Sequence, residues 1–568
     1  MDHTLPLEYS ATPYEPVIDR IQDWPIARFY QDKNRILNAV HEDTRNQLGL
    51  EFGLGDQDVM KVVEQTMYLE QIRRKENPWK VDPKDEKKFW SQIKGNLVNF
   101  EQASRRGDWE QGQAAEVLDV IIDRYAREIS NTFRPGTYHF AKRFLPFFFS
   151  TLLNASAGKT FKALIHHKMQ LQEKVHLLGA IDTLRSLSKK GTVILVPTHM
   201  SNVDSILVGW SLHALGLPAF IYGAGLNLFN SKVLAYFMKR LGAYKLDRRK
   251  RNPVYLNTLR SYVTYATLQG VHGIFFPGGG RIRSGEIEKK LKLGLLGSVI
   301  DSQRRMLLPD PKAVHSKVFV VPLVMSYHFV LEARSLINQY LTRTGQESYY
   351  LPNDEFSSTS KFLKFVWNSF SRTSEITLSF GQPMDVWGNH VDDNGNSFDH
   401  QGRLLDISHY FLHKGEIKKD AQRDREYTRI LGNRIVERYH IENYVFSSHI
   451  VAFVAFELIK KRFPAFEIYS LLRLAWEDRL IEKDSLYKAV ERVLTQLFRL
   501  KDQGKVHLAY HITPDIAKLI DHGITNLGIF HPRRPLGIME DGRITSYDMN
   551  LLYYYHNRLL GYGLERLI

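Results

Sequence analysis

The chain has 568 residues, too many for one hydrophobic core, so its length predicts several domains. Its composition is globular, with 43% hydrophobic and 24% charged residues, which excludes a fibrous or wholly disordered chain. Lysine and arginine outnumber acidic residues by 77 to 62, so we expect anionic partners: nucleic acid, phosphorylated substrates or acidic lipid. A basic protein without such a partner is the alternative. The absence of cysteine excludes disulfides and cysteine-ligated zinc.

Two segments bear on targeting and membranes. Residues 1–6 have neither a basic stretch nor an apolar core, so no signal peptide is predicted. No apolar run approaches the ~20 residues that a membrane span needs. The most apolar segment, residues 144–153, is short and flanked by basic residues, and it is compatible with either a membrane interface or a core helix.

The predicted elements change character twice along the chain. Residues 1–140 are predicted to be helical, because segments such as 58–75 and 111–132 carry apolar residues at three- and four-residue spacing. Short β-rich runs then alternate with helical segments such as 205–215 and 257–268. The predicted strands are 192–197, 219–222, 243–246, 273–276, 318–325 and 375–380. This alternation indicates the α/β class, with a central, mostly covered β-sheet and flanking helices.

The last third of the chain is predicted to be mainly helical, with a short strand at 505–509. A polar loop at 388–403 precedes it. The loop has the aspartate and asparagine content of a calcium loop, but Ser397 and Arg403 stand where glycine and glutamate are required, which argues against calcium. We therefore predict three regions: helical N-terminal residues 1–140, an α/β domain at 141–390 and a mainly helical C-terminal region at 391–568.

His199 and Asp204 stand five residues apart, just after the predicted strand 192–197. The end of such a strand is where α/β proteins place their sites. We interpret His199 as a general base whose ring Asp204 holds in one tautomer. The alternative is a pair that only caps a helix. Ser201 is interpreted as a turn or N-cap residue, because no Gly-x-Ser-x-Gly motif surrounds it.

Two later segments could bind an anion. Residues 242–251 end in a basic cluster that includes Arg248, which favours either a phosphate site or a solvated charged surface. Residues 278–285 carry three glycines followed by Arg281 and Arg283, so backbone N–H groups and guanidinium groups can meet one ligand. The glycine spacing fits neither a Walker loop nor a dinucleotide fingerprint, and a plain tight turn is the alternative.

A fourth segment, 318–327, reads as a buried strand interrupted by Pro322. Because proline has no N–H group to donate to a sheet, we expect a strand end or a β-bulge at this position, beside the site. Simple packing of the strand in the core is the alternative.

These four segments, in this order, resemble the motifs of the glycerolipid acyltransferase superfamily, with Leu246 in the isoleucine position of the second motif. The chain is most similar to its glycerol-3-phosphate acyltransferases, whose Gly-Gly-Arg-Ser-Arg-Thr-Gly motif resembles residues 279–285. Their Tyr-x-x-Val-x-Glu motif is matched by Tyr327, Val330 and Glu332. The resemblance covers about 190–390, with a looser match at 551–558.

Two residues depart from that family's pattern. Gly278 stands where the family usually has glutamate, and Thr198 stands where it usually has asparagine before the histidine. The first departure puts recognition of the acceptor, and with it the rate, in question. The second leaves the histidine–aspartate pair intact.

The resemblance implies transfer of a fatty acyl group from acyl-CoA or acyl-ACP (acyl carrier protein) to the sn-1 hydroxyl of glycerol-3-phosphate, giving lysophosphatidate. In that reaction His199 is the base and Asp204 orients it. The substrate-binding residues are then Arg248, Gly279, Gly280, Arg281, Arg283, Lys292 and Pro322.

The same resemblance implies no metal and no bound cofactor, since the acyl thioester is a co-substrate. The expected partners are glycerol-3-phosphate, acyl-CoA or acyl carrier protein, and an anionic membrane surface on the cytoplasmic face, where the protein would be peripheral. Nucleic acid is not expected. The alternatives are acylation of lysophosphatidate or dihydroxyacetone phosphate, and a non-catalytic basic protein that binds membranes or nucleic acid.

Overall fold

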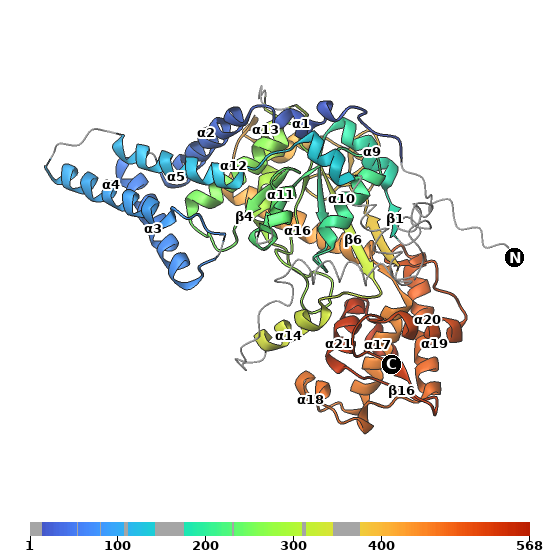
Figure 1. The fold of residues 1–568 in the computed structure, drawn as a ribbon. Helices are drawn as coiled ribbons and strands as arrows, with labels where there is room; N and C mark the ends of the chain where they lie inside the picture. Colours follow the sequence, from blue (N-terminus) through green and yellow to red (C-terminus); the bar gives the residue numbers. More distant parts are fainter. Residues whose placement is uncertain are drawn as a thin grey trace.

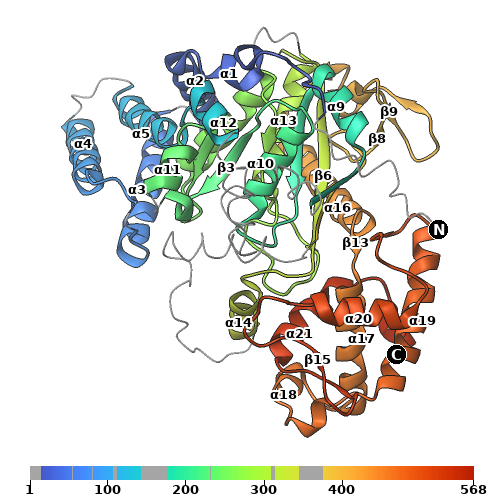
Figure 2. The ribbon, with the colours of Figure 1, turned by 45° about the vertical axis from the view of Figure 1, so that its right-hand side comes forward.

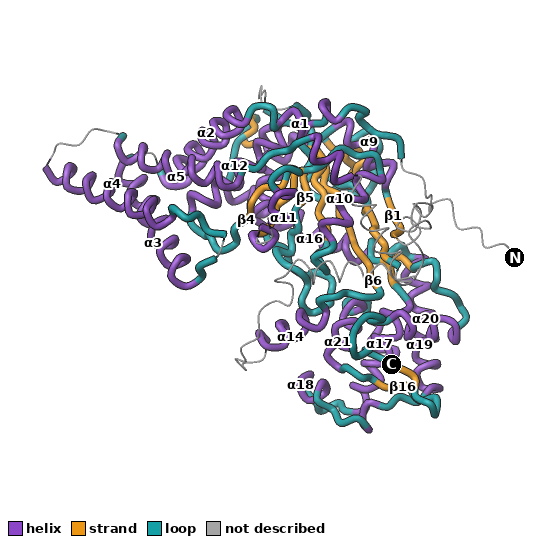
Figure 3. Tube along the Cα trace, in the orientation of Figure 1, coloured by secondary structure: helices purple, strands orange, loops and turns teal. Residues whose placement is uncertain are grey.

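A seven-stranded sheet forms the centre of the protein, with helices on both faces (Figures 1 and 3). The computed structural model describes residues 14–53, 55–79, 81–106, 112–142, 175–229, 232–308, 314–344 and 375–568. The strands of the sheet are β1 (Val175–Gly179), β2 (Thr192–Pro197), β3 (Ile221–Gly225), β4 (Ala243–Leu246), β5 (Gly273–Ile274), β6 (Val318–Tyr327) and β7 (Ile376–Phe380). The predicted α/β class is thus confirmed.

The strand order is β1-β7-β6-β2-β5-β3-β4. The five strands from β6 to β4 are parallel, whereas β7 pairs antiparallel with β6 and parallel with β1. β2 lies in the middle and is buried along its whole length, as its uninterrupted apolar sequence requires. Six of the seven strands were predicted, and β1 was not.

The two faces of β2 pack against different helices. Val193 and Leu195 share a core with α9 (Ile181–Lys190) and α10 (Asp204–Ala214). Ile194 and Val196 point the other way, into a core with α13 (Leu293–Met306) and α16 (Ala421–Ile441). α12 (Pro253–Leu268) packs beside α13. Because side chains alternate along a strand, a one-residue slip would exchange these two faces, so the packing on both sides specifies the register of β2.

Pro322 lies inside β6 at a β-bulge. Leu323 pairs with Phe380, and Val320 forms a bridge to Met384, so two residues of β6 face three residues of the opposite segment. A bulge relaxes the regular ladder, and a residue without an N–H group is tolerated there. The predicted bulge is confirmed, whereas the substrate-binding role of Pro322 remains a prediction.

The N-terminal helices are α1 (Pro25–Phe29), α2 (Lys33–Phe52), α3 (Asp56–Glu76), α4 (Glu86–Arg106) and α5 (Gln113–Ile129). Helices α2 to α5 lie on the left of Figure 1, whereas α1 lies at the top, near the sheet. α2 and α5 both pack against α12, and apolar residues of these helices share one core with β3, β4 and α12. This helical region therefore shares its core with the sheet domain.

The C-terminal helices form a bundle below the sheet in Figures 1 and 2. α17 (Ser447–Arg462) is buried on almost every side, and α19 (Lys483–Asp502), α20 (Ile516–Asn526) and α21 (Met549–His556) pack around it. The short strands β13 (Tyr444–Val445) and β14 (His507–Leu508) pair beside the bundle, so the strand predicted near 507 exists.

The smaller elements connect these layers. They are α11 (Lys232–Met238), α14 (Ala333–Thr344), α18 (Ile468–Leu472), β8 (His390–Val391), β9 (Ser397–Phe398), β10 (Leu404–Leu405), β11 (Leu412–His413), β12 (Glu416–Ile417), β15 (Gly537–Ile538) and β16 (Ile544–Thr545). β8 and β9, which lie in the polar loop 388–403, form a small antiparallel sheet with β10, which directly follows it.

Among the residues described, every helix is too short or too polar to cross a bilayer. The apolar segment 144–153, for which a membrane interface and a core helix were both considered, lies outside the described residues.

Candidate active site

Four loops meet at the carboxyl ends of the parallel strands. His199 follows β2, Arg248 follows β4, the glycine loop 278–285 follows β5, and Glu332 follows β6. In a parallel sheet all these ends lie at the same edge, which is where α/β proteins gather functional groups. The structure thus brings together the segments that the sequence indicated, although more than 130 residues separate the first from the last.

Asp204 holds His199 through a fully buried carboxylate. Its Oδ2 atom lies 2.9 Å from His199 Nδ1 and also accepts the backbone N–H groups of Met200 and Ser201, at 2.6 and 2.8 Å. Its Oδ1 atom accepts the hydroxyl of Tyr327 at 2.6 Å. A carboxylate that takes four donors requires the ring proton of His199 on Nδ1, which leaves Nε2 with a free lone pair.

The ring of His199 is mostly covered, with 14% of the side chain exposed. One face packs against Phe276, at 4.3 Å between ring centroids. The backbone is fixed as well, because the carbonyl of His199 accepts the N–H of Ile282 at 2.7 Å. The backbone, one ring face and Nδ1 of His199 are therefore all held in place, and Nε2 is the atom left to take a proton. A general base needs this kind of fixed orientation.

Glu332 ties the histidine turn to the glycine loop. Its buried carboxylate accepts Ser201 Oγ at 2.8 Å, the N–H of Asn202 at 3.0 Å and Arg281 Nη1 at 3.2 Å. The hydroxyl of Ser201 is therefore a donor in a structural network, which supports its interpretation as a turn residue. Arg281 is held within reach of His199 by the same carboxylate.

Three arginines gather around the glycine loop. Arg248 Nη1 lies 3.7 Å from where a Cβ atom on Gly280 would be. Burial lowers the pKa of Arg283, and the positive charges of Arg343, Arg281 and Arg248 lower it further. Within the described ranges neither Arg248 nor Arg283 has a carboxylate partner. Such uncompensated positive charge is suited to a doubly charged phosphate.

Lys292 packs against the glycine loop. Its N–H donates to the carbonyl of Pro277 at 2.7 Å, and its side chain passes Gly279 so closely that a Cβ atom there would lie 2.8 Å from Lys292 Cγ. Gly279 also has a φ of +75°, which glycine adopts without strain. The close approach and the backbone angle both require glycine at this position. Phosphate binding by Lys292 remains a prediction.

Glu288 is a feature of the site that sequence analysis missed. Its Oε1 atom accepts the backbone N–H of His199 at 3.2 Å, and its Oε2 atom is buried without a hydrogen-bond partner in the described part of the chain. Burial raises the pKa of Glu288 to about 7. A Cβ atom on Gly278 would lie 3.0 Å from Oε1, so the glutamate uses space that a side chain at 278 would need. No motif links residue 288 to this place.

The C-terminal bundle also contributes to the site. Arg558 is buried and donates to the carbonyl of Met325 at 2.8 Å and to Asn443 Oδ1 at 3.0 Å, while its Nη1 lies 3.5 Å from the sulfur of Met200. Asn557 donates to the carbonyl of Ser284 in the glycine loop at 2.8 Å. The sequence signal for these contacts is the loose match at 551–558, which by itself indicates no role for Asn557 or Arg558.

Comparison with known proteins agrees with this geometry. Residues 179–326 match the family model described as Acyltransferase. The chain carries an acyltransferase domain. The match begins at the end of β1 and reaches β6, so this acyltransferase domain includes His199, Asp204 and the glycine loop, whereas Glu332 and Arg558 lie beyond the matched residues.

Several curated relatives of the acyltransferase domain are named glycerol-3-phosphate acyltransferase. The protein of Alteromonas mediterranea is 26% identical over 295 residues, which cover 51% of this chain and 31% of the relative. Those of Pseudoalteromonas atlantica and Pseudomonas savastanoi are 28% and 27% identical over 208 residues, or 36% of this chain and 23% of each relative. The chain therefore spans less than a third of the length of the curated relatives it matches. These relatives support the predicted membership of the glycerol-3-phosphate acyltransferase family.

Proposed function

We propose that this protein transfers a fatty acyl group from an acyl thioester to the sn-1 hydroxyl of glycerol-3-phosphate, giving lysophosphatidate. One observation carries the proposal: the paired side chains of His199 and Asp204 lie beside the glycine loop, which carries Arg281 and Arg283 and approaches Arg248, and neither Arg248 nor Arg283 has a carboxylate partner among the described residues. A base next to concentrated positive charge suits a substrate that carries both an alcohol and a phosphate. The names of the curated relatives support the same acceptor.

The reaction follows from the tautomer of His199. Its Nε2 atom takes the proton of the acceptor hydroxyl, and the oxygen attacks the carbonyl carbon of the thioester. The tetrahedral intermediate then collapses as the carbon–sulfur bond breaks, and the thiolate takes the proton back from the imidazolium. Asp204 stabilises the charged ring throughout and keeps Nδ1 protonated. No acyl-enzyme forms in this scheme, because the acceptor oxygen itself is the nucleophile.

Binding of the acceptor would be the task of the arginines. Arg248 and Arg283 offer parallel N–H groups to the phosphate, and Arg281 stands nearest to the histidine turn because Glu332 holds it there. Backbone N–H groups of the glycine loop would stabilise the oxyanion of the intermediate. Phosphate and hydroxyl of one small molecule would then contact groups that the fold already places side by side.

The donor and the location belong to the same proposal. The acyl group would come from acyl-CoA or acyl carrier protein, whose phosphates and acidic surface suit a chain with a net charge of +15. The lipid product favours a peripheral position on the cytoplasmic face of an anionic membrane. We propose no bound cofactor and no metal in the reaction itself.

The test measures thiol release from palmitoyl-CoA by the purified full chain, with and without glycerol-3-phosphate. We expect release that depends on the acceptor, and we expect His199→Ala to lower kcat by about 10²–10⁴-fold, the usual contribution of a general base. His409→Ala is the matched control, because this histidine is exposed and remote from the site. Dihydroxyacetone phosphate and lysophosphatidate are tested as competing acceptors in the same assay.

Two results would overturn the proposal. Thiol release by His199→Ala at the wild-type rate would remove the histidine from the mechanism. Acceptor-independent release, or a higher kcat/KM for lysophosphatidate than for glycerol-3-phosphate, would show that the arginines serve another substrate.

A further inference from the structure

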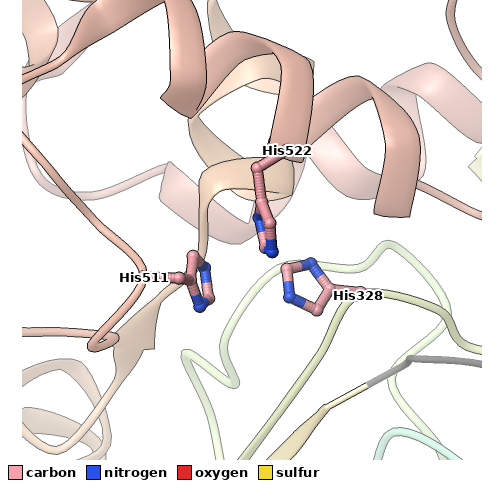
Figure 4. A group of neighbouring side chains, drawn as sticks. All are labelled: His328, His511 and His522. Atoms are coloured by element: carbon pink, nitrogen blue, oxygen red, sulfur yellow. The ribbon is translucent and has the colours of Figure 1, made fainter. Parts of the chain in front are cut away.

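Three histidines from distant parts of the chain meet where the sheet joins the C-terminal bundle. His328 directly follows β6, His511 follows β14, and His522 lies in α20. Figure 4 shows the three rings turned toward a common centre, and one ring nitrogen of each lies within 4.8 Å of the other two. None of these histidines is a matched motif residue, since His328 occupies an unspecified position between Tyr327 and Val330, and the proposed reaction assigns none of them a role.

The spacing of the rings suits a shared metal ion. The ring centroids are 5.1 Å apart for His328 and His511, 5.5 Å for His328 and His522, and 4.5 Å for His511 and His522. Zinc lies about 2 Å from a ligating nitrogen, so tetrahedral geometry separates the centroids of two imidazole ligands by about 5 Å. The rings therefore need only small rotations to point their nitrogens at one ion.

Two of the rings already have the hydrogen bonds of metal ligands. His328 Nδ1 lies 2.8 Å from Ser448 Oγ, and His522 Nδ1 lies 2.8 Å from Ser447 Oγ. If each Nδ1–H donates to its serine, each Nε2 keeps a lone pair for an ion, and a metal-bound histidine typically uses its second nitrogen in this way. Burial lowers the pKa of both rings, which keeps them neutral.

The Nε2 atom of His328 gives the second observation. It is buried and has no hydrogen-bond partner among the residues that the structure describes, and the residue is 1% exposed. A buried polar atom without a partner is rare in native proteins, and an ion beside it is one of the few physical explanations. The lone pair of a neutral ring is the type of ligand that zinc prefers to oxygen donors.

His511 completes the set. Its Nε2 accepts the backbone N–H of Ser447 at 3.2 Å, and its Nδ1 lies 3.5 Å from a carboxylate oxygen of Glu375. Coordination through Nε2 would replace that single hydrogen bond and leave the Nδ1–H group 3.5 Å from the Glu375 carboxylate. A carboxylate behind an imidazole raises its basicity and fixes its orientation, as in many zinc sites.

We propose that His328, His511 and His522 bind one zinc ion that fastens the C-terminal bundle to the end of β6. At this position the ion would stabilise the contact between β6 and the C-terminal bundle. His328 is the neighbour of Tyr327, whose hydroxyl donates to Asp204. An ion at this place would hold the end of the strand that supports the histidine–aspartate pair, at a distance from the reacting atoms.

The experiment uses the full chain after removal of metals with a chelator. Titration with zinc chloride alone, followed by calorimetry and by metal analysis after gel filtration, should give one tightly bound ion per chain. Saturating zinc should raise Tm by about 5 °C, because a ligand that binds only the folded state stabilises it. Cobalt(II) in place of zinc should give the visible absorption of a tetrahedral site.

His522→Ala is the informative variant, because this ring is half-buried on the outer helix α20 and its loss spares the sheet. It should lose the stoichiometric zinc, the rise in Tm and the cobalt spectrum. His507→Ala is the matched control, since this exposed histidine lies four residues before His511 and pairs with Glu442 instead. Its zinc binding should equal that of the wild type. A wild-type chain that binds no stoichiometric zinc, or His522→Ala that binds it equally, would overturn the proposal.

Discussion

Glu288 places a carboxyl group directly behind the backbone of His199. Glu288 can be compared with the residue at position 278, because the family that the chain resembles usually has a glutamate there and this chain has Gly278. With only a hydrogen atom at 278, the side chain of Glu288 fits against that residue, 3.0 Å from where a Cβ would be. The site therefore still has an acidic group beside the glycine loop, supplied from ten residues further along the chain. Its hydrogen bond to the N–H of His199 makes it a positioning residue.

The pKa of Glu288 leads to a prediction about stability. Burial raises this pKa from 4.5 to about 7, so the folded protein binds the proton more tightly than the unfolded chain does. Folding stability must then fall as pH rises from about 4.5 to about 7, by an amount on the order of 3 kcal/mol for this group. Glu288→Gln cannot titrate and should escape that loss. The Tm of the variant relative to wild type should therefore rise between pH 5 and pH 8.

Thermal unfolding of both proteins across this pH range checks the expectation. Glu437→Gln is the control, because this glutamate is exposed on α16, and its Tm difference from wild type should stay constant. A Tm difference for Glu288→Gln that does not change with pH would mean that the carboxyl group is solvated in the folded protein.

Sequence reasoning reached some of these residues and missed others for identifiable reasons. His199 and Asp204 are five residues apart, and a short turn after a strand can bring them together only in a few ways. Glu288 carries no motif, and its role depends on the loop folding back under Gly278. Arg558 lies more than 350 residues from Met200 and reaches it only because the C-terminal bundle packs there. Contacts of that kind are set by tertiary packing, which local patterns do not encode.

Among the secondary-structure elements, too, the sequence predicted some correctly and missed others. Predicted strands matched β2 and β4 residue for residue, because continuous apolar runs of four to six residues between turn signals describe buried parallel strands well. β1 was missed because it is a short edge strand with only two buried residues. β7 was found, but its antiparallel pairing with β6 was not, because the sequence of a strand does not state its direction in the sheet. The segment 273–276 was expected to be a longer strand, yet β5 ends at residue 274.

The packing of α21 against the glycine loop leads to a second prediction. Gly285 has a φ of +84°, and a Cβ atom there would lie 2.0 Å from the carbonyl oxygen of Tyr554. Gly285→Ala must therefore push the loop away from α21 and shift the arginines that precede it. We expect a loss of more than about 1 kcal/mol of stability, and a fall of about 100-fold in kcat/KM for glycerol-3-phosphate, since displacements of about 1 Å have such effects.

Steady-state kinetics and Tm of the purified variant test this expectation. Gly209→Ala on α10 is the control, because a Cβ atom there meets nothing within 4 Å, and it should keep both activity and stability. Wild-type kinetics in Gly285→Ala would show that the bundle does not position the loop.

The three regions of the protein do not form three separate units in a row, because they share hydrophobic cores. The N-terminal helices share a core with α12 and β4, and the C-terminal bundle shares one with the sheet through the end of β6. The predicted boundaries near 140 and 390 follow changes in pattern along the chain. They could not reveal these shared cores, because apolar faces of helices do not state which partner covers them. The bundle is therefore part of the site's support, a role no motif suggested.

The net charge of the chain leads to the last prediction. A lipid product and a formal charge of +15 together favour attachment to anionic membranes, where each basic residue near the surface contributes about 1 kcal/mol. We expect the full chain to sediment with vesicles of phosphatidylglycerol and phosphatidylcholine at low salt, and to be released at about 0.5 M salt as screening shortens the range of the attraction. Vesicles of phosphatidylcholine alone are the control and should leave it in the supernatant. Sedimentation that ignores both salt and lipid charge would instead point to apolar insertion, and no sedimentation with anionic vesicles at low salt would contradict membrane attachment altogether.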